Sequence, residues 1–422
     1  MSLEERSGRV YDIAVIGGGA AGCMAAVRAA ELGRRVVLIE RNDAICRKVL
    51  ITGKGRCNLT NVAPPEDFIE RFGKQGQFLR SAFHAFFNED LMDFFRTAGL
   101  EVKVERQGRV FPVTDSARSV TEVFRKRLGD LGAVVLYGLR LSAITQAPEG
   151  FRLTFDGSKE IVGAQRVILA TGGASYQATG SSGDGYVIAH KLGHAISKHA
   201  LGLVPLTTKE AWVKDLQGLG LENIRLTFVC GKKKIVSEIG ELMFTHFGVS
   251  GPLVLDLSAR ILGMLKSGEV RLFIDLKTGM TVDQLEKRLL NEFKVKGKAQ
   301  LKTILKEYLP QRLIDLFTKL SGIDPRREAC QVTLGERRAL IGLFKALPLA
   351  ISGSLSGEEA MVTGDGIAIK EIDPRSMESR LVNGLYFAGE IIEGSAPSGG
   401  YNLQQAFSTG YLAGQKAAES LG

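Results

Sequence analysis

The alternation of hydrophobic and polar residues at the start of the chain predicts a βαβ unit. Residues 11–16 form an apolar run that ends in glycines, as buried parallel strands do. Helix-forming and small apolar residues follow at 20–32, and residues 34–40 form a second apolar run that ends in an acid. A strand, a glycine turn, a helix and a second strand within about thirty residues make up a βαβ unit.

The pattern changes twice further along the chain. Before residue 194 it predicts helices at 78–98 and 116–132, a hairpin at 101–113, and strands at 133–146, 151–157 and 165–173. Short alternating segments then predict a β-rich region, and residues 279–345 have the pattern of consecutive helices. After residue 357 the strand, glycine and helix pattern returns. We therefore predict a multidomain α/β protein with three parts: a split Rossmann-like domain of residues 1–193 and 357–422, a β-rich domain of 194–278 and 346–356, and an inserted helical domain of 279–345.

Composition places the chain among ordinary soluble proteins. Of its 422 residues, 45% are hydrophobic and 24% charged, which allows a large core without disulfides. The five cysteines are scattered and include no CxxC pair, so neither a structural zinc site nor a redox dithiol is indicated. The polar start and the absence of any apolar run near 18 residues predict a cytoplasmic protein that does not span a membrane.

The excess positive charge is concentrated in one region. The chain carries a net charge of +9, and residues 277–345 hold 15 Lys/Arg and 8 Asp/Glu, a net charge of +7. Two interpretations stay open. The region is either a solvated helical surface or a patch for a polyanion such as RNA.

The glycine turn after the first strand predicts dinucleotide binding. Gly17, Gly19 and Gly22 form a G-x-G-x-x-G sequence that follows a strand and opens a helix. Such glycines permit a tight turn, the approach of a diphosphate to the backbone, and close packing of helix on strand. Glu40, 18 residues beyond Gly22, stands where an acid holds a ribose hydroxyl. The predicted contacts of this part are Gly17, Gly19, Ala20, Ala21, Gly22, Glu40 and Arg41.

Two later segments favour FAD over NAD. Residues 167–175 and 383–394 resemble the second and third fingerprints of FAD proteins of the glutathione-reductase type, in which an acid after the third strand binds the ribityl chain of the flavin. Glu390 stands here where those proteins have Asp. A glycine pair before a helix at 395–410 could place the helix N-terminus toward the flavin. The candidate residues are Ala170, Thr171, Gly172, Gly389, Glu390, Gly399, Gly400, Tyr401, Asn402 and Leu403.

With these residues in view, the chain resembles the aminoacetone-oxidase-like FAD-binding enzymes, the BaiN-type flavoproteins. Four motifs carry the resemblance: the glycine turn at 17–22, "GKGRCNLTN" at 53–61, "FTHFGVSGP" at 244–252, and "AGEIIEGSAPSGGYNLQ" at 388–404. The resemblance implies a glutathione-reductase-type FAD domain that is split around a β-barrel-like domain, itself interrupted by a helical domain. It also implies FAD that is bound tightly but not covalently.

The resemblance places the loop at 53–61 along the FAD. Gly53, Gly55, Arg56, Asn58 and Thr60 are therefore predicted to contact the cofactor. Glycines let the backbone approach a flat ring, and a guanidinium suits phosphate or the charge of a reduced flavin.

Cys57, in the same loop, has two interpretations. It is either a catalytic thiol activated beside Arg56 or a small residue that packs under the ring.

The remaining site candidates are single residues. His246 is the best acid/base candidate of the five histidines, because imidazole titrates near neutral pH, although a structural role is the alternative. Arg109 could face the cofactor or the substrate, and Leu141 could contact adenine through its backbone. His190 and His194 have helical spacing but no accompanying carboxylate, so no metal site is predicted.

Three hypotheses about function stay open. The first is an FAD-dependent oxidoreductase that reduces a carbon–carbon double bond in a small molecule with hydride from NAD(P)H; amine oxidation is the opposite direction that the family name suggests. The second is reduction of uridine in ribosomal RNA, with the basic helices holding the RNA. The third is a flavin-binding scaffold or redox sensor without turnover. The oligomeric state is left open.

Overall fold

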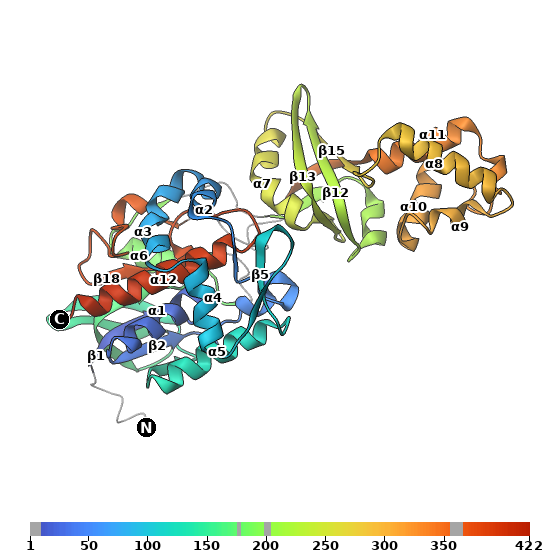
Figure 1. Ribbon diagram of the computed structural model, residues 1–422. Helices are drawn as coiled ribbons and strands as arrows, with labels where there is room; N and C mark the ends of the chain where they lie inside the picture. The colour runs from blue at the N-terminus through green and yellow to red at the C-terminus, as the bar shows by residue number, and fades with distance from the viewer. Residues whose placement is uncertain (1–9, 175–178, 198–203, 355–365) are drawn as a thin grey trace. The chain divides into compact units, whose positions relative to one another are not determined.

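The computed structural model describes residues 10–174, 179–197, 204–354 and 366–422. The chain forms two compact units, one of residues 1–202 and 357–422 and the other of residues 203–356 (Figure 1). Each unit has its own hydrophobic core. Among the described helices, none combines the length and the apolar character that crossing a bilayer requires.

A mostly parallel sheet forms the centre of the first unit. Its described strands lie in the order β6-β2-β1-β9-β8-β7, with β18 beside β9. Parallel pairing joins β1 to β2 and β9, β2 to β6, and β9 to β18. Strand β8 pairs antiparallel with both β9 and β7. The strands are β1 (Val10–Ile16), β2 (Val36–Glu40), β6 (Val134–Tyr137), β7 (Leu141–Ala147), β8 (Gly150–Phe155), β9 (Ile161–Leu169) and β18 (Leu385–Phe387). All five residues of β2 are buried, as expected for an apolar run covered on both faces.

The register of this sheet brings separate glycine segments to one edge. Ile16, Ile39 and Phe387 are the last or next-to-last residues of their strands. Ile16 is paired with Ile39 and with Leu169, and Leu169 is paired with Phe387. Because the carboxyl ends of parallel strands meet at the same edge, the segments that follow all four strands lie there together.

Helices α1 and α12 lie side by side in the first unit (Figure 1). A Cβ atom on Gly410 would stand 2.3 Å from the carbonyl oxygen of Ala21, and one on Gly414 would stand 2.4 Å from that of Ala25. Only glycine permits so close an approach of the two backbones. The helices of this unit are α1 (Ala20–Glu31), α2 (Pro65–Arg71), α3 (Arg80–Ala85), α4 (Asn88–Thr97), α5 (Ala117–Asp130), α6 (Asp184–Lys191) and α12 (Tyr401–Glu419), with short 3₁₀ helices η1 (Val49–Gly55), η2 (Gly73–Leu79), η3 (Arg106–Gly108), η8 (Ile369–Glu371) and η9 (Gly389–Ile391).

The predicted helical character of 78–98 is confirmed by α3 and α4, but the helix breaks between them. Phe86 is extended, with φ −159° and ψ 108°. Its carbonyl oxygen accepts a hydrogen bond from Ser408 Oγ (2.6 Å), and Asn88 Nδ2 donates to the carbonyl oxygen of Asn61 (2.8 Å). These tertiary hydrogen bonds stabilise the break between the two helices.

Two small sheets complete the described part of this unit. The predicted hairpin at 101–113 is confirmed by β4 (Val102–Val104) and β5 (Arg109–Pro112), and β5 also pairs with β3 (Thr60–Asn61). β10 (Ile196–Ser197) pairs with β17 (Gly366–Ile367). β3 thus holds the end of the 53–61 loop against β5.

The second unit contains a closed barrel. Its described strands follow the order β11-β14-β13-β12-β15-β16, and β16 pairs with β11 to close the ring. The strands are β11 (Leu206–Thr208), β12 (Gly220–Cys230), β13 (Lys233–Phe244), β14 (Gly248–Ser250), β15 (Val270–Asp275) and β16 (Leu347–Ser354), with η5 (Ala211–Leu216) and α7 (Pro252–Leu265) between strands. Buried and exposed residues largely alternate along β12, which explains the period-2 pattern of the sequence.

The predicted helices of 279–345 are confirmed as α8 (Val282–Val295), α9 (Leu301–Leu305), α10 (Gln311–Ser321) and α11 (Leu334–Lys345), with η6 (Ala329–Gln331). Thr281 and Gln284 form a capping box at the start of α8, and Thr333 and Glu336 form one at α11. The helices share one hydrophobic cluster with the barrel. The boundaries of a separate helical domain therefore stay a prediction.

Candidate cofactor site

The turn between β1 and α1 requires glycine at two positions. Gly17 has φ +102°, and a Cβ atom on it would stand 2.5 Å from the carbonyl oxygen of Ala170. A Cβ atom on Gly22 would stand 1.8 Å from the carbonyl oxygen of Gly17. These two glycines serve packing, because they bring the first turn of α1 against the ends of β1 and β9.

Gly19 differs from these glycines because the space beside it is open. It is the N-cap of α1, with φ −78° and ψ −172°, and a Cβ atom on it would meet no atom within 4 Å. No side chain caps the helix, and the first turn has no acidic residue. Backbone N–H groups at Gly19, Ala20 and Ala21 therefore lie at an open, electropositive helix end, which fits a diphosphate.

Glu40 lies beside this turn, at the end of β2. Its Oε2 accepts a hydrogen bond from the N–H of Gly18 (2.7 Å), and its Oε1 accepts from the backbone N–H (2.8 Å) and from Nδ2 (2.7 Å) of Asn42. The side chain is buried at 7% exposure. A carboxylate offers about four acceptor positions, and these hydrogen bonds occupy three of them. This position fits the predicted contact with ribose.

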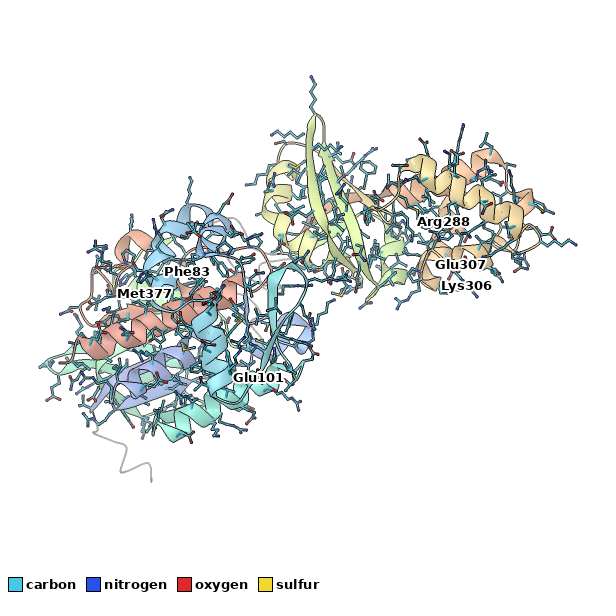
Figure 2. All side chains as sticks on the ribbon, viewed as in Figure 1. Phe83, Glu101, Arg288, Lys306, Glu307 and Met377 are labelled. Atoms are coloured by element: carbon cyan, nitrogen blue, oxygen red, sulfur yellow. The ribbon has the colours of Figure 1, made fainter. Side chains whose placement is uncertain are left out.

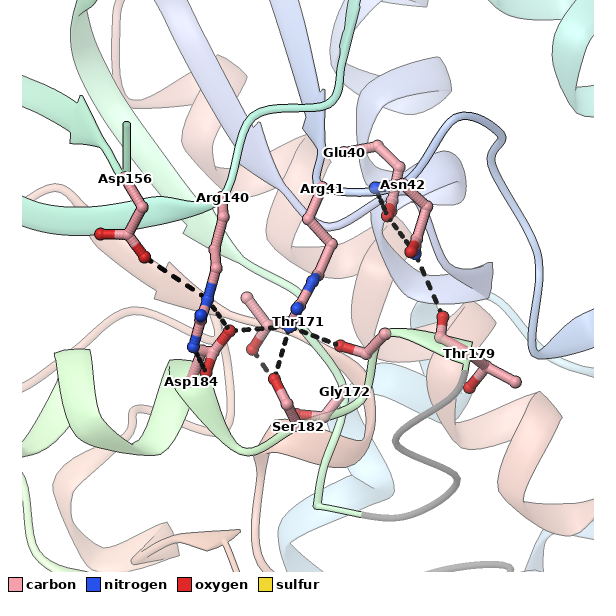
Figure 3. A network of polar contacts seen from close by, with 11 residues as sticks. Glu40, Arg41, Asn42, Arg140, Asp156, Thr171, Gly172, Thr179, Ser182 and Asp184 are labelled. Carbon is pink, nitrogen blue, oxygen red and sulfur yellow. Dashed lines mark hydrogen bonds and ion pairs between the residues drawn. The ribbon is translucent and has the colours of Figure 1, made fainter. Parts of the chain in front are cut away.

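An ion-pair network holds the segment after β9 against the end of β2 (Figure 3). Arg41 Nη1 donates to Ser182 Oγ (2.5 Å) and to Asp184 Oδ2 (2.8 Å), and Arg140 donates to both oxygens of Asp184 at 2.7 and 2.9 Å. Asn42 Nδ2 also donates to the carbonyl oxygen of Thr179 (3.2 Å). Arg41, predicted to contact the cofactor, is thus engaged with protein carboxylate and hydroxyl groups.

Asp184 carries the charge that joins the two arginines. Partial burial alone would raise the pKa of this carboxyl, but hydrogen bonds from Arg140 and Ser182 outweigh it, and the pKa lies below its usual value. Asp184 is also the first residue of α6, where the helix dipole favours an anion. The predicted adenine contact, Leu141, directly follows Arg140 and is buried at the start of β7.

The second fingerprint continues the edge of the sheet. The N–H of Ala170 donates to the carbonyl oxygen of Ile16 (2.9 Å), so Ala170 extends β9 along β1. A Cβ atom on Gly185 would stand 2.0 Å from Thr171 Oγ1, and Gly172 has φ +74°. This segment therefore packs tightly between the glycine turn and α6.

The third fingerprint meets the first turn of α1. Gly389 has φ +78°, and a Cβ atom on it would stand 2.7 Å from Cβ of Ala21. Its N–H donates to Thr409 Oγ1 on α12 (2.9 Å). Glu390, the predicted ribityl ligand, accepts a hydrogen bond from Lys48 Nζ (2.5 Å). Lys48 is a residue that the sequence analysis did not select.

The loop at 53–61 joins the N-terminus of α12. With its side-chain amide assigned from the surrounding donors and acceptors, Asn58 donates to the carbonyl oxygen of Thr60 (3.0 Å) and accepts from the N–H of Gly400 (3.0 Å). A Cβ atom on Gly400, which has φ +99°, would stand 2.4 Å from the carbonyl group of Thr60. Asn61 Nδ2 donates to the carbonyl oxygen of Gly399 (3.1 Å). Two predicted cofactor segments, far apart in sequence, are therefore joined by hydrogen bonds from asparagine side chains to the backbone and by a close approach of their backbones.

Three residues at the start of α12 have roles within the protein. Asn402 closes the preceding loop, since its Nδ2 donates to the carbonyl oxygen of Ala396 (2.7 Å) and its Oδ1 accepts from the N–H of Ala396 (2.8 Å). The buried ring of Tyr401 packs edge-on against Phe68 at 4.6 Å between centroids. Leu403 is half-buried against the core.

The two arginines predicted near the flavin are engaged with other groups. Arg56 donates to both carboxylate oxygens of Glu105 (2.9 and 3.1 Å) and to Asp115 (3.1 Å), and lies 4.0 Å over the ring of Phe111. Arg109 Nε donates to the carbonyl oxygen of Arg106 (3.2 Å). Contacts of Arg56 and Arg109 with a cofactor or substrate stay predictions.

Cys57 has the surroundings of a packing residue. It is fully buried, with φ +64°, and burial raises the pKa of its thiol to about 12. Its N–H donates to the carbonyl oxygen of Thr52 (3.1 Å). A thiol with so high a pKa carries almost no thiolate at neutral pH, which favours the packing interpretation.

The histidines divide between the two units. His246 is exposed in the second unit, on the turn between β13 and β14, with its ring edge-on to Phe247 (4.9 Å). His194, in the first unit, is buried; its Nε2 is 2.8 Å from Ser379 Oγ, and burial lowers its pKa. The described residues hold no group of three or more His, Cys, Asp or Glu side chains placed to bind a metal ion.

The fold and the site define a Rossmann-type flavoprotein. An open helix N-terminus, a held carboxylate beside it, and a second acid after a third parallel strand fit the diphosphate, ribose and ribityl groups of FAD. These features are those of an FAD-binding site.

The chain belongs to the HI0933-like family. The family model described as the HI0933-like protein Rossmann domain matches residues 11–416. The chain is 32% identical over 410 residues to the 3-dehydro-bile acid delta(4,6)-reductase of Clostridium scindens, covering 96% of this chain and 99% of that protein. It is 31% identical over 406 residues to the ribosomal RNA dihydrouridine synthase of Escherichia coli, covering 96% and 97%.

Solved structures share the fold. The flavocytochrome c3 fumarate reductase matches with a TM-score of 0.54 and 16% identity, over 99% of this chain and 79% of that one. The 3-ketosteroid delta1-dehydrogenase of Sterolibacterium denitrificans matches with a TM-score of 0.56 and 14% identity, over 97% of this chain and 100% of that one. At such identities the likeness concerns the fold alone.

We expect Gly19→Val to lower FAD retention at least tenfold without preventing folding. The backbone angles of Gly19 suit valine and no protein atom stands in the way, so the added methyl groups project into the space that a diphosphate would use. FAD content after gel filtration and the melting temperature of the apoprotein measure the two effects. Gly129→Val, at an open position on the exposed face of α5, is the matched control; full FAD retention in Gly19→Val would contradict the assignment.

We expect Cys57→Ala to retain FAD and to keep turnover within about twofold, because the buried thiol is almost entirely protonated. A modest fall in melting temperature should accompany the loss of the buried sulfur. Cys330→Ala, at an exposed thiol of the second unit, is the control for handling effects. A hundredfold loss of turnover with FAD still bound would show that the thiol takes part in the chemistry.

Proposed function

We propose that this protein reduces a carbon–carbon double bond conjugated to a carbonyl group, with electrons that NAD(P)H delivers to bound FAD. The observation that supports this most is chemical. The relatives that match over almost the whole chain are a delta(4,6)-reductase of a 3-dehydro-bile acid and a dihydrouridine synthase, and both names denote the addition of hydrogen across a ring double bond. The conjugated double bond is the part that these different substrates share.

The flavin supplies the hydride chemistry when it is bound. In reduction of a conjugated double bond, the hydride adds to the β carbon and a proton adds to the α carbon, so the protein must place a proton donor near the acceptor. We propose His246 for this role, because its imidazole is exposed and is a side chain that can donate a proton to carbon. Arg109 is the second candidate for orienting the acceptor, through its guanidinium.

The electron donor and the acceptor are proposed to use one flavin in turn. The sequence contains one G-x-G-x-x-G, at residues 17–22, and that turn fits FAD. NAD(P)H would therefore bind without a dinucleotide-binding motif of its own, at the flavin. This arrangement predicts double-displacement kinetics, in which the oxidised pyridine nucleotide leaves before the acceptor binds.

A second candidate function is the reduction of uridine in ribosomal RNA. The relatives from Escherichia coli and Haemophilus influenzae with this activity in their names are 31% and 30% identical to the chain. The helical region of the second unit carries the net charge of +7, and Arg288 and Lys306 are exposed on it together with Glu307 (Figure 2). Several of these cations form ion pairs with protein carboxylates, namely Arg288, Lys296, Arg326, Arg327, Arg337 and Lys345. The small-molecule acceptor is thus our first choice.

A cytoplasmic location is proposed as well, since all five cysteines are free thiols.

We expect the yellow holoprotein to be bleached anaerobically by NADPH or NADH and to recover its colour with one class of acceptor. The acceptors to compare are a steroid 4,6-dien-3-one and a ribosomal RNA fragment that lacks dihydrouridine. Reoxidation by the steroid in low and high salt supports the small-molecule function. Reoxidation by the RNA alone, falling steeply with salt, supports the second candidate. A holoprotein that neither nucleotide bleaches would contradict the proposal and favour an oxidase or a redox sensor.

We expect His246→Ala to bleach with NAD(P)H at the rate of the unaltered protein but to be reoxidised by the acceptor at least tenfold more slowly. Hydride transfer from the nucleotide needs no proton donor, whereas saturation of the double bond does. Stopped-flow measurement of the two half-reactions separates the effects. Phe247→Leu, which alters the neighbouring ring, is the control. An unchanged reoxidation rate in His246→Ala would remove His246 from the mechanism.

A further inference from the structure

The contact between Lys48 and Glu390 joins two of the cofactor segments through their side chains. Lys48 lies directly before η1 and the loop at 53–61, whereas Glu390 follows β18. Lys48 Nζ is 2.5 Å from Glu390 Oε2. Both side chains are largely shielded from water, at 24% and 18% exposure. Water and salt screen such a pair less than a surface pair.

The position of Glu390 gives this pair its significance. Gly389, the preceding residue, lies so close to the first turn of α1 that a Cβ atom on it would stand 2.7 Å from Cβ of Ala21, and the open N-terminus of α1 fits the diphosphate. A carboxylate so near a diphosphate site repels the anion unless a cation compensates its charge. Lys48 is a cation whose contact with that carboxylate is direct.

We propose that Lys48 is a cofactor-positioning residue. Its ammonium group compensates the charge of Glu390, so that the carboxylate accepts hydroxyl hydrogen bonds from the ribityl chain of FAD close to the diphosphate. The same contact holds the start of the 53–61 loop against the third fingerprint. The inference rests on the FAD site and not on the identity of the acceptor, so it stands or falls independently of the proposed reaction.

Three substitutions at these two positions test the proposal. Lys48→Met keeps the length of the side chain and removes its charge, Lys48→Arg keeps the charge, and Glu390→Gln removes the charge to be compensated. The rate at which FAD leaves the diluted holoprotein, followed by the rise in flavin fluorescence, is the first readout. The melting temperature of each variant is measured beside it, because a merely structural ion pair would change the melting temperature and leave FAD release unchanged.

We expect Lys48→Met to release FAD at least tenfold faster, which corresponds to about 1.4 kcal/mol of binding free energy. Lys48→Arg should remain within about threefold of the unaltered protein. The double variant Lys48→Met with Glu390→Gln should release FAD more slowly than Lys48→Met alone, because the charge that Lys48 compensates is removed together with Lys48. Lys416→Met is the matched control. It removes the ion pair of Lys416 with Glu419 (2.7 Å), which lies near the C-terminal end of α12 in the same unit, and it should leave FAD release unchanged.

Two outcomes would overturn the inference. If Lys48→Met releases FAD within twofold of the unaltered protein, the ammonium group does not serve the cofactor. If the effects of Lys48→Met and Glu390→Gln simply add in the double variant, Lys48 does not act through Glu390. Should Lys48→Met fail to fold, Lys48→Gln and the single variant Glu390→Gln allow the same comparison.

Discussion

The close approach of α1 to its neighbours is the constraint on which the first unit depends. Gly17 and Gly22 bring the backbone of α1 close to β1 and β9, and Gly410 and Gly414 bring it close to α12. A further close approach, at Gly389, fixes the first turn from the side of β18. Because these contacts are between backbone atoms or Cβ atoms, they leave little freedom for the helix to shift. The N-terminus of α1 therefore has a fixed place relative to both acids, Glu40 and Glu390.

Charge within the site is arranged around this fixed point. The helix end supplies partial positive charge without any side chain, and Glu40 is held by backbone and amide N–H groups instead of by a cation. Glu390 and Asp184, in contrast, are each paired with basic side chains. Glu40, the carboxylate predicted to contact ribose, is thus held by neutral donors, whereas basic side chains compensate the charges of Glu390 and Asp184.

Much of this arrangement could be predicted from the sequence, because it depends on local patterns. The glycine turn, the acid that ends β2 and the apolar runs of the parallel strands each lie within a few consecutive residues, and the structure confirms the strands and helix they predict. The pairing of Lys48 with Glu390 could not be predicted, since the two residues are 342 positions apart and no sequence motif of fixed spacing links them. Arg56 shows the opposite case. Its place in a glycine-rich loop suggests an anionic ligand, but Glu105 and Asp115 come to it through the fold of the β4–β5 hairpin. The break between α3 and α4 likewise depends on partners from β3 and α12 that a local pattern does not contain.

The place of the helical region within the second unit bears on how this family can change in evolution. β15 and β16 are antiparallel neighbours, and Ile274 is paired with Leu347, so the segment between them starts and ends at adjacent positions. Topologically it is a hairpin loop that folds into helices and shares one hydrophobic core with the barrel. Enlarging a loop from a few residues to about seventy costs only about 2.5 kcal/mol of closure entropy, which a folded insert readily offsets. The two ends of the insert can therefore stay in place on the barrel while its length changes, whereas the shared hydrophobic core limits how freely its sequence can be exchanged.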